Sequence, residues 1–302
     1  MAVIAGPTAS GKSALALAVA ARVGGVIINA DASQLYADLR IVSARPSADE
    51  EALVPHRLYG VLDGDDGASA ARWADMAKAA IAEAQAEGRL PILVGGTGMY
   101  LATLIHGIAP VPEIDPVVRA TVCDLATAEA AAALVAEDPA LAARLMAGDR
   151  QRISRGLEVV RSTGRSLLHW QATRVGGIGE ANVCAVVVDV PRAVLNARAE
   201  TRLRQMVEAG ALAEVAALLA RGLPANRPVL RALGVPELAA VLDGSSTLEA
   251  AVTTAATATR QYQKRQLTWA RNQVPDWPRI DPVDGDAAAT LVTAMFTASA
   301  IS

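Results

Sequence analysis

The stretch from Met1 to Ser13 constrains the fold more than any other part of the chain. Residues 1–5 are a short apolar run, which predicts a buried strand. The next eight residues read Gly-Pro-Thr-Ala-Ser-Gly-Lys-Ser and match the G-x-x-x-x-G-K-[ST] phosphate loop, and an Ala/Leu-rich helical pattern follows directly. A strand, this loop and a helix in this order predict an α/β core that binds a phosphate group at the helix N-terminus.

The positions of the loop have defined chemical uses. Gly6 and Gly11 let the backbone wrap closely, so that its N–H groups point at phosphate oxygens. Lys12 adds a positive charge, and the hydroxyl of Ser13 is a candidate ligand for Mg²⁺. The loop predicts a phosphate ligand, but it indicates neither which ligand binds nor whether a phosphoryl group is transferred.

Composition narrows the class of protein. The chain has 302 residues, room for one large domain or two smaller ones, and 52% of them are hydrophobic, which argues against disorder. No apolar run reaches about 18 residues, so no membrane span is expected. No signal peptide is expected either, because the N-terminus has no basic region. Cys123 and Cys184 lie far apart, which predicts free thiols in a reducing cytoplasm.

The distribution of charge is uneven. The net charge of −3 argues weakly against a nucleic-acid partner, yet all 12 basic residues between 119 and 204 are Arg. Residues 260–279 hold five basic residues and one acidic residue. Arg suits phosphate contacts, although ordinary solvated helix faces explain the same charges.

Two further strands end in candidate site residues. Residues 26–30 predict a strand that delivers Asp31 at its carboxyl end, where parallel sheets place ligands. Asp31 is equally a candidate base, metal ligand or helix N-cap. Residues 90–94 predict another strand, followed by Gly-Gly-Thr-Gly-Met-Tyr. Many phosphate-loop nucleotidases have an Asp there that holds Mg²⁺, so its absence argues against routine nucleotide hydrolysis. A simple tight turn also explains the glycines.

The remaining chain predicts a core interrupted by an insertion. Residues 37–60 look irregular, and Ser69 is a plausible N-cap for a helix that ends near Gly88. Residues 116–172 read as helical and Arg-rich, and the β-branched run at 183–190 resumes the sheet. Pro191 is expected to begin a helix that carries Arg198 and Arg202, and further helices are expected at about 206–221, 235–242 and 247–272. We therefore predict an α/β fold with a phosphate-loop core (1–112), a helical insertion (113–180) and a second core part with C-terminal helices (181–302).

The last of these helices carries Tyr262 and Trp269 among cations. Aromatic rings interleaved with positive charges suit RNA, through stacking and phosphate contacts. The same pattern suits a helix that packs its aromatic face on the core.

In combination, these segments resemble the bacterial tRNA dimethylallyltransferases, also called tRNA isopentenyltransferases. The resemblance runs from Gly6 to about Arg271, with the family's motifs in order: GPTASGKS, DASQLY, SARP, PHRL, GGTGMY, DRQRISRGLEV and TRQYQKRQLTW. It implies transfer of a dimethylallyl group from dimethylallyl diphosphate to N6 of the adenosine just 3′ of the anticodon in tRNA. It also implies a cytoplasmic monomer. The sequence departs from the usual family residues at Ala32, Ser43, Arg45, Gly156 and Gln263, and Ala32, in place of a serine, puts one tRNA contact in doubt.

The resemblance also implies roles for individual residues. Asp31 would be the general base, and Thr97 would line the channel where the substrates meet. The diphosphate would be bound, with Mg²⁺ on Ser13, by Arg202 and the loop residues Gly6, Pro7, Thr8, Ala9, Ser10, Gly11, Lys12 and Ser13. The tRNA, with its target base flipped out, would contact Asp31, Ala32, Ser33, Gln34, Thr97, Arg119, Gln151, Arg152, Ile153, Ser154 and Arg155.

Two alternatives use the same motifs. A small-molecule kinase would bind ATP on the loop and use Asp31 to activate an acceptor hydroxyl. A nucleotide switch or RNA-binding protein would bind without catalysis, but the Asn-Lys-x-Asp motif of a GTPase is absent from the sequence. A kinase explains neither the Arg-rich insertion nor the basic aromatic helix.

Overall fold

The chain forms two compact units. The computed structural model describes residues 1–301; Ser302, the last residue of the predicted C-terminal part, lies outside the described residues. The first unit contains Met1–Leu104 and the chain from Gly179 onward, and the second contains Ile105–Ile178. None of the described helices is long and apolar enough to cross a membrane. The predicted α/β fold class is confirmed.

The first unit is built on a parallel sheet with the strand order β3-β2-β4-β1-β5-β6. β1 lies between β4 and β5, with Ala2 opposite both Ile92 and Cys184. The inner strands are buried, which is why they read as continuous apolar runs. The bounds are β1 Ala2–Ala5, β2 Val26–Asn29, β3 His56–Arg57, β4 Pro91–Gly95, β5 Cys184–Val188 and β6 Arg279–Ile280.

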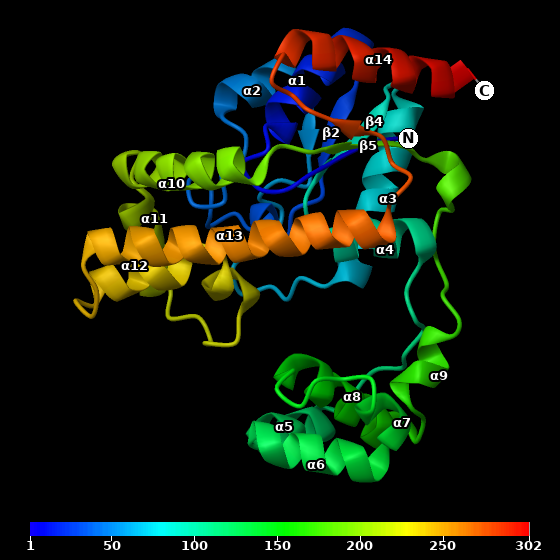
Figure 1. The fold of residues 1–302 in the computed structure, drawn as a ribbon, viewed down its shortest axis with the longest axis vertical. Coiled ribbons are helices and arrows are strands. Elements are labelled where there is room, and N and C mark those ends of the chain that lie inside the picture. Colours follow the sequence, from blue (N-terminus) through cyan, green and yellow to red (C-terminus); the bar gives the residue numbers. More distant parts are fainter. Residues whose placement is uncertain (302) are drawn as a thin grey trace. The chain divides into compact units, whose positions relative to one another are not determined.

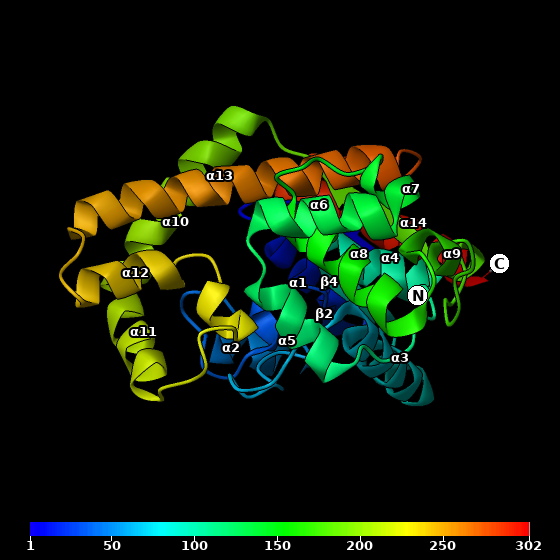
Figure 2. The ribbon, with the colours of Figure 1, turned by 90° about the horizontal axis from the view of Figure 1, so that it is seen from below.

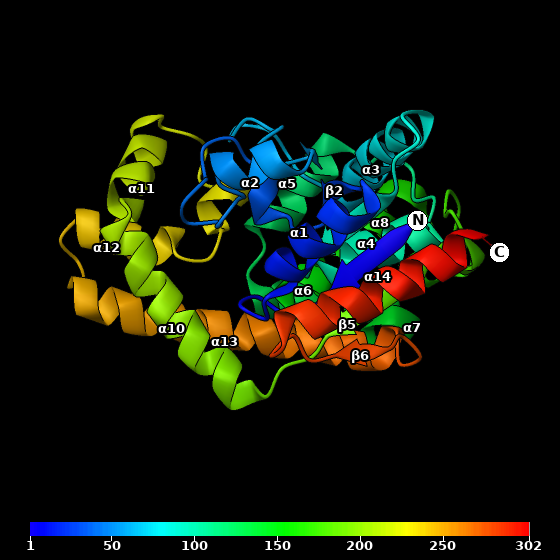
Figure 3. The same cartoon turned by 90° about the horizontal axis from the view of Figure 1, so that it is seen from above.

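Two helices cover one face of the sheet. α1 (Lys12–Val23) and α14 (Gly285–Ile301) lie side by side over the strands, as Figures 1 and 3 show. Leu15 and Val19 of α1 meet Phe296 of α14 in the main hydrophobic cluster of this unit. Neither α14 nor β6 was predicted as an element from the sequence.

The opposite face is covered by α3 (Ala70–Ala86) and α4 (Gly98–His106). Ser69 accepts a hydrogen bond from the N–H of Arg72, as expected for the predicted N-cap. Trp73 is buried; its indole N–H donates to the carbonyl of Asn29 at 2.9 Å, and its ring stacks on Tyr100. This contact fixes α3 against the end of β2.

A helical arm follows β5. It comprises α10 (Arg192–Glu208), α11 (Ala211–Ala220), α12 (Val235–Leu242) and α13 (Leu248–Gln273). The helix predicted at 206–221 corresponds to α11 but begins too early, because α10 continues to Glu208 and Gly210, with φ +105°, separates the two helices. α12 lies along the first part of α13 (Figures 1 and 2). The region predicted as irregular contains α2 (Ala48–Leu53) as well as β3.

The second unit is helical and has its own core. Val122, Leu134 and Leu157 are among the buried residues that join its helices. A Cβ at Gly156 would lie 2.6 Å from Leu141, so glycine allows α8 to pack closely here. The helices are α5 Pro116–Asp124, α6 Thr127–Glu137, α7 Pro139–Ala142, α8 Arg150–Thr163 and α9 Leu167–Gln171.

The packing of α14 gives a stability prediction. Phe296 is the only phenylalanine and is 1% exposed, so Phe296→Ala should lower the free energy of unfolding by about 3–5 kcal/mol. The matched control is Leu291→Ala, because Leu291 lies on the same helix and is 53% exposed. Urea unfolding of the three proteins measures both changes, and equal midpoints for the two variants would contradict the packing role of Phe296.

Candidate active site

The loop between β1 and α1 has the conformation of an anion-binding loop. Ala9 and Gly11 have positive φ angles of 65° and 93°. This left-handed geometry turns successive N–H groups toward one point. Among the described residues, the N–H groups of Ala9, Gly11, Lys12 and Ser13 have no hydrogen-bond acceptor. They lie at the N-terminus of α1, where the helix dipole also favours an anion.

α13 holds this loop through two buried glutamines. Gln266 Oε1 accepts a hydrogen bond from the N–H of Thr8 at 2.9 Å, and Gln263 Nε2 donates to the carbonyl of Thr8 at 2.9 Å. Gln266 Nε2 also donates to the carbonyl of Gly96 at 3.0 Å. The helix therefore fixes the phosphate loop relative to the end of β4.

These contacts clarify the aromatic and basic segment of α13. Gln263 and Gln266 face the sheet, whereas Lys264 and Arg265 are exposed. Trp269 packs directly over Gly98. The sequence pattern of α13 suited either RNA binding or packing on the core. Packing on the core accounts for the face of α13 that carries Gln263, Gln266 and Trp269. Sequence reasoning missed the glutamines, although their i, i+3 spacing puts them on one helix face.

The glycines at the end of β4 and just after it are required by close packing. A Cβ at Gly95 would overlap the backbone of Ala30, and one at Gly96 would overlap the side chain of Gln266. A Cβ at Gly98 would overlap the ring of Trp269. At Gly95 and Gly96 the neighbours include backbone atoms of Ala30 and Gly6, so a side chain there, including a carboxylate, would require the backbone to move.

Asp31 lies at the carboxyl end of β2 and is oriented by its neighbours. Asn29, which is buried, accepts from the N–H of Asp31 at 2.7 Å and donates to its carbonyl at 2.9 Å. The Oδ1 atom of Asp31 accepts from the Ser33 hydroxyl at 2.7 Å and from the Ser33 N–H at 3.1 Å. Its Oδ2 atom accepts no hydrogen bond within the described chain. One carboxylate oxygen is therefore fixed and the other remains available.

Thr97 connects this turn to the end of β4. Its Oγ1 accepts from the N–H of Ala32 at 3.1 Å and lies 3.5 Å from the hydroxyl of Tyr262. Its own N–H donates to the carbonyl of Ala30 at 3.2 Å. Thr97 therefore lies next to Asp31 and positions the backbone that carries it.

Two cavities meet at Asp31. The first, of about 80 Å³, has Thr8, Lys12, Ser13 and Arg202 at its polar end. The second, of about 290 Å³, is lined by aromatic and basic side chains that include Tyr36, Tyr100, Arg231 and Arg265. Asp31, Ser33, Leu233 and Tyr262 line both. The structure thus brings the predicted loop, Asp31, Ser33 and Arg202 together around the first cavity, and Ala32 lines the second.

The electrostatics of the first cavity favour an anion. Burial lowers the pKa of Lys12 to about 8, with the negative charge of Asp31 opposing the shift and Arg202 adding to it. Burial likewise lowers the pKa of Arg202, and Asp31 again opposes the shift. Burial raises the pKa of Tyr262 to about 12, so its hydroxyl stays protonated at neutral pH. Among the described residues, neither Lys12 nor Arg202 forms an ion pair at contact distance.

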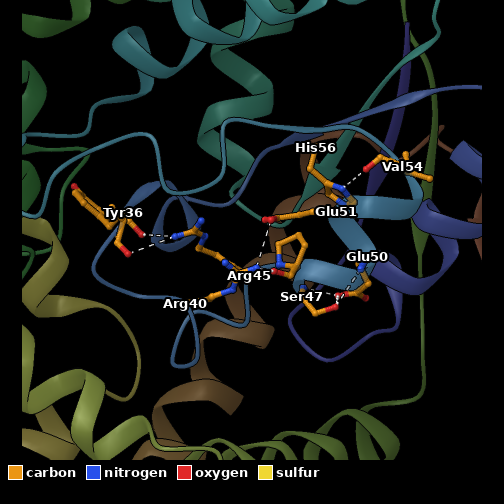
Figure 4. A network of polar contacts seen from close by, with 10 residues as sticks. Tyr36, Arg40, Arg45, Ser47, Glu50, Glu51, Val54 and His56 are labelled. Carbon is orange, nitrogen blue, oxygen red and sulfur yellow. Dashed lines mark hydrogen bonds and ion pairs between the residues drawn. The ribbon is translucent and has the colours of Figure 1, made fainter.

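The loop after Asp31 is fixed by internal hydrogen bonds. Gln34 Nε2 donates to the carbonyls of Ser43 and Ala44 at 3.1 and 2.8 Å. Figure 4 shows Arg45 directed at the carbonyl of Tyr36 and Arg40 paired with Glu51. The amide nitrogen of Gln34, a predicted tRNA contact, therefore stabilises this loop.

The second unit presents the predicted Arg-rich segment on α8. Gln151 and Arg152 are exposed, and Arg152 forms an ion pair with Asp149 at 3.1 Å. Arg155 lies 3.6 Å from Glu158. Ile153 is different, because it is 2% exposed and belongs to the core of this unit.

Two other arginines of this unit differ in their pairing. Arg119 is exposed and has no ion-pair partner among the described residues, whereas Arg161 is bound by Glu137 through both of its carboxylate oxygens. Arg161 is therefore less available for an external phosphate than Arg119.

The residues around Ser13 suit a metal that arrives with a phosphate ligand. No group of three or more His, Cys, Asp or Glu residues that could hold a metal occurs in the described part of the chain. Ser13 and Asp31 line the same cavity, with the N–H groups of the loop beside them. Mg²⁺ commonly binds through few protein ligands, substrate phosphates and water, and this donor set fits that mode.

The fold and site define a class: a phosphate-loop α/β protein with a carboxylate between an anion-binding cavity and a second cavity. Sequence comparison is more specific. The family described as IPP transferase matches residues 34–273, so the chain belongs to the IPP transferase family of tRNA dimethylallyltransferases. The protein of that name from Sphingopyxis alaskensis is 58% identical over 282 residues, 92% of either chain. The one from Zymomonas mobilis is 50% identical over 279 residues, 92% of this chain and 89% of that one.

Solved structures agree with this assignment. The tRNA isopentenylpyrophosphate transferase of Bacillus halodurans is 32% identical, with a TM-score of 0.72 over 99% of this chain and 95% of that one. A eukaryotic dimethylallyltransferase acting on tRNA is 25% identical, with a TM-score of 0.79 over 96% of this chain and 76% of that one. The kinase and switch alternatives are therefore set aside.

The lowered pKa of Lys12 predicts pH-dependent anion binding. A bound diphosphate favours protonated Lys12, so binding should be strong below pH 8 and weaken by up to about tenfold per pH unit above it. Calorimetry with inorganic diphosphate and Mg²⁺ at pH 7 and pH 9 measures this effect. In Lys12→Arg the cation stays protonated, which corrects for the ligand's own titration; the same pH dependence in both proteins would contradict the role of Lys12.

Proposed function

We propose that this protein transfers a dimethylallyl group from dimethylallyl diphosphate to N6 of the adenosine 3′-adjacent to the anticodon in tRNA. The observation that carries the proposal is the position of Asp31, which lines both the anion-binding cavity and the aromatic cavity. A prenyl donor in the first cavity and an adenine in the second cavity would meet at the carboxylate of Asp31. Family membership supports the same reaction.

The donor diphosphate would occupy the phosphate loop. Negative charge develops on the diphosphate as it leaves. This charge would be stabilised by Lys12, Arg202 and the unpaired N–H groups of residues 9 and 11–13. Mg²⁺ on Ser13 would supply further neutralisation of that charge. Gln263 and Gln266 occupy both backbone groups of Thr8, so its side chain, which lines the cavity, is the part that would face the ligand.

The acceptor adenine would enter the second cavity. Tyr36, Tyr100 and Tyr262 line it and offer aromatic surface to a base flipped out of the anticodon loop. Arg231 and Arg265 would interact with flanking phosphates, and Arg265 already lies 5.5 Å over the ring of Tyr262.

The chemistry requires one bond to form and one to break. The adenine N6 attacks C1 of the donor, the C1–oxygen bond breaks, and diphosphate leaves. The exocyclic amine is barely acidic before attack, so Asp31 takes its proton late, once the nitrogen has become cationic. The free Oδ2 of Asp31 is the atom available for this proton, because Oδ1 is bound by Ser33.

The proposal is tested with labelled dimethylallyl diphosphate and unmodified tRNA. The wild-type protein should transfer the label to tRNA. Asp31→Asn keeps the shape and removes the base, so the rate should fall by about 10² to 10⁴ while tRNA binding is retained. No transfer by the wild-type protein would contradict the function, and near-normal transfer by Asp31→Asn would contradict the role of Asp31.

The second unit would bind the anticodon stem-loop, mainly through phosphates. Arg119, Gln151 and Arg152 would contribute exposed groups, and the half-buried Ser154 and Arg155 would contribute a hydroxyl and a charge. Because phosphate binding releases counterions, tRNA affinity should fall steeply with salt, with a slope of roughly −0.7 to −0.9 per contact.

Replacing Arg152 and Arg155 together by Ala should flatten this salt slope by roughly one to two units. Donor binding should hardly change. The matched control removes Arg89 and Arg204, which are paired with glutamates in the first unit, and should leave the slope unchanged. Measuring tRNA affinity against salt decides the question, since identical slopes would exclude α8 from the RNA-binding surface.

A further inference from the structure

The first cavity has an apolar end that the phosphate chemistry does not explain. α10 lines the cavity with Ala199, Arg202, Leu203 and Met206, a spacing that places them on one helix face. Arg202 belongs to the phosphate end. Met206 lies four residues further along the helix, which corresponds to about 6 Å at the usual rise per residue.

Several elements close this end together. Leu203 and Met206 pack against Ala255 of α13 in a separate hydrophobic cluster. Val42, from the loop after Asp31, and Leu233, from the segment before α12, complete the wall. The wall is therefore built from four segments that are distant in sequence.

The wall is held rigidly on the Val42 side. Glu214 of α11 accepts three hydrogen bonds from successive backbone N–H groups: Arg40 and Ile41 at 2.6 and 2.8 Å, and Val42 at 2.8 Å. Gly234 has φ +93°, and a Cβ there would lie 3.1 Å from Val42. Val42 therefore cannot easily move away to make space for a longer ligand.

We infer that this apolar wall selects the length of the donor's prenyl chain, with Met206 as the residue that sets the limit. The inference rests on the proposed function. A dimethylallyl group extends about 4 Å beyond its reacting carbon, whereas a geranyl group extends roughly 9 Å. With the diphosphate at Arg202, a dimethylallyl group would fit within the roughly 6 Å of α10 between Arg202 and Met206, whereas a geranyl group would reach Met206 and Ala255.

The energetic consequence is discrimination against longer donors. Forcing extra methylenes into a packed wall costs about 1–3 kcal/mol or more, and every 1.4 kcal/mol is a factor of ten. The wild-type protein should therefore use geranyl diphosphate less efficiently than dimethylallyl diphosphate, by about fivefold to 150-fold.

The experiment compares the two donors in the wild-type protein and in Met206→Ala. Shortening Met206 should raise the ratio of kcat/KM for geranyl over dimethylallyl diphosphate by about tenfold or more, with mass spectrometry of the tRNA product identifying the attached group. Met206→Leu conserves the volume and should keep the wild-type ratio. Met295→Ala is the matched control, because Met295 packs against the main cluster around α14 and does not line the cavity.

Binding of each donor is measured separately by calorimetry without tRNA. This readout distinguishes failure of the inference from failure of the proposed function, since selective binding can be seen even if no transfer occurs. Equal binding of both donors by the wild-type protein, or an unchanged ratio in a folded Met206→Ala, would overturn the inference. If Met206→Ala does not fold, Met206→Val gives the same test with a smaller loss of volume.

Discussion

The hydrogen bonds between α13 and the backbone of Thr8 organise the site. A phosphate loop needs a fixed backbone, because its N–H groups bind an anion only where they converge. Gln263 and Gln266 satisfy both backbone groups of Thr8, and Gln266 also reaches Gly96. The same two side chains thereby fix the distance between the loop and the strand end next to Asp31. Together with the hydrogen bond from the Gly6 N–H to the carbonyl of Gly95 at 3.3 Å, they position the cationic side of the site relative to the carboxylate.

The charges of the site are balanced only in part. Asp31 stabilises the charged forms of Lys12 and Arg202, yet burial still lowers the pKa of both. The protein therefore contains two desolvated cations facing one carboxylate, an arrangement that costs stability in the free protein and favours a polyanionic ligand. A diphosphate supplies the missing negative charge, and its departure restores the unfavourable state.

The sequence was sufficient for the parts of the structure that depend on local pattern. The apolar runs of β1, β2, β4 and β5, the loop between β1 and α1, and the N-cap at Ser69 all follow from neighbouring residues. The second cavity could not be predicted, because Tyr36, Tyr100, Arg231 and Arg265 come from four separate segments. The break between α10 and α11 was predicted several residues before Gly210, because the residues between the predicted and the observed boundary favour helix. The burial of Ile153 was obscured by its basic neighbours.

The long sequence separation of the Thr8 contacts has a consequence for synthesis of the protein. The phosphate loop is synthesised well before the glutamines that hold it, because Gln266 follows Thr8 by 258 residues. At about 5–20 residues per second, roughly 13 to 50 seconds pass before the glutamine exists. β1 also pairs with β5, which comes from beyond the second unit. A nascent or truncated chain that ends before α13 therefore lacks the contacts that fix the loop, and we expect it to bind diphosphate ligands more weakly than the finished protein.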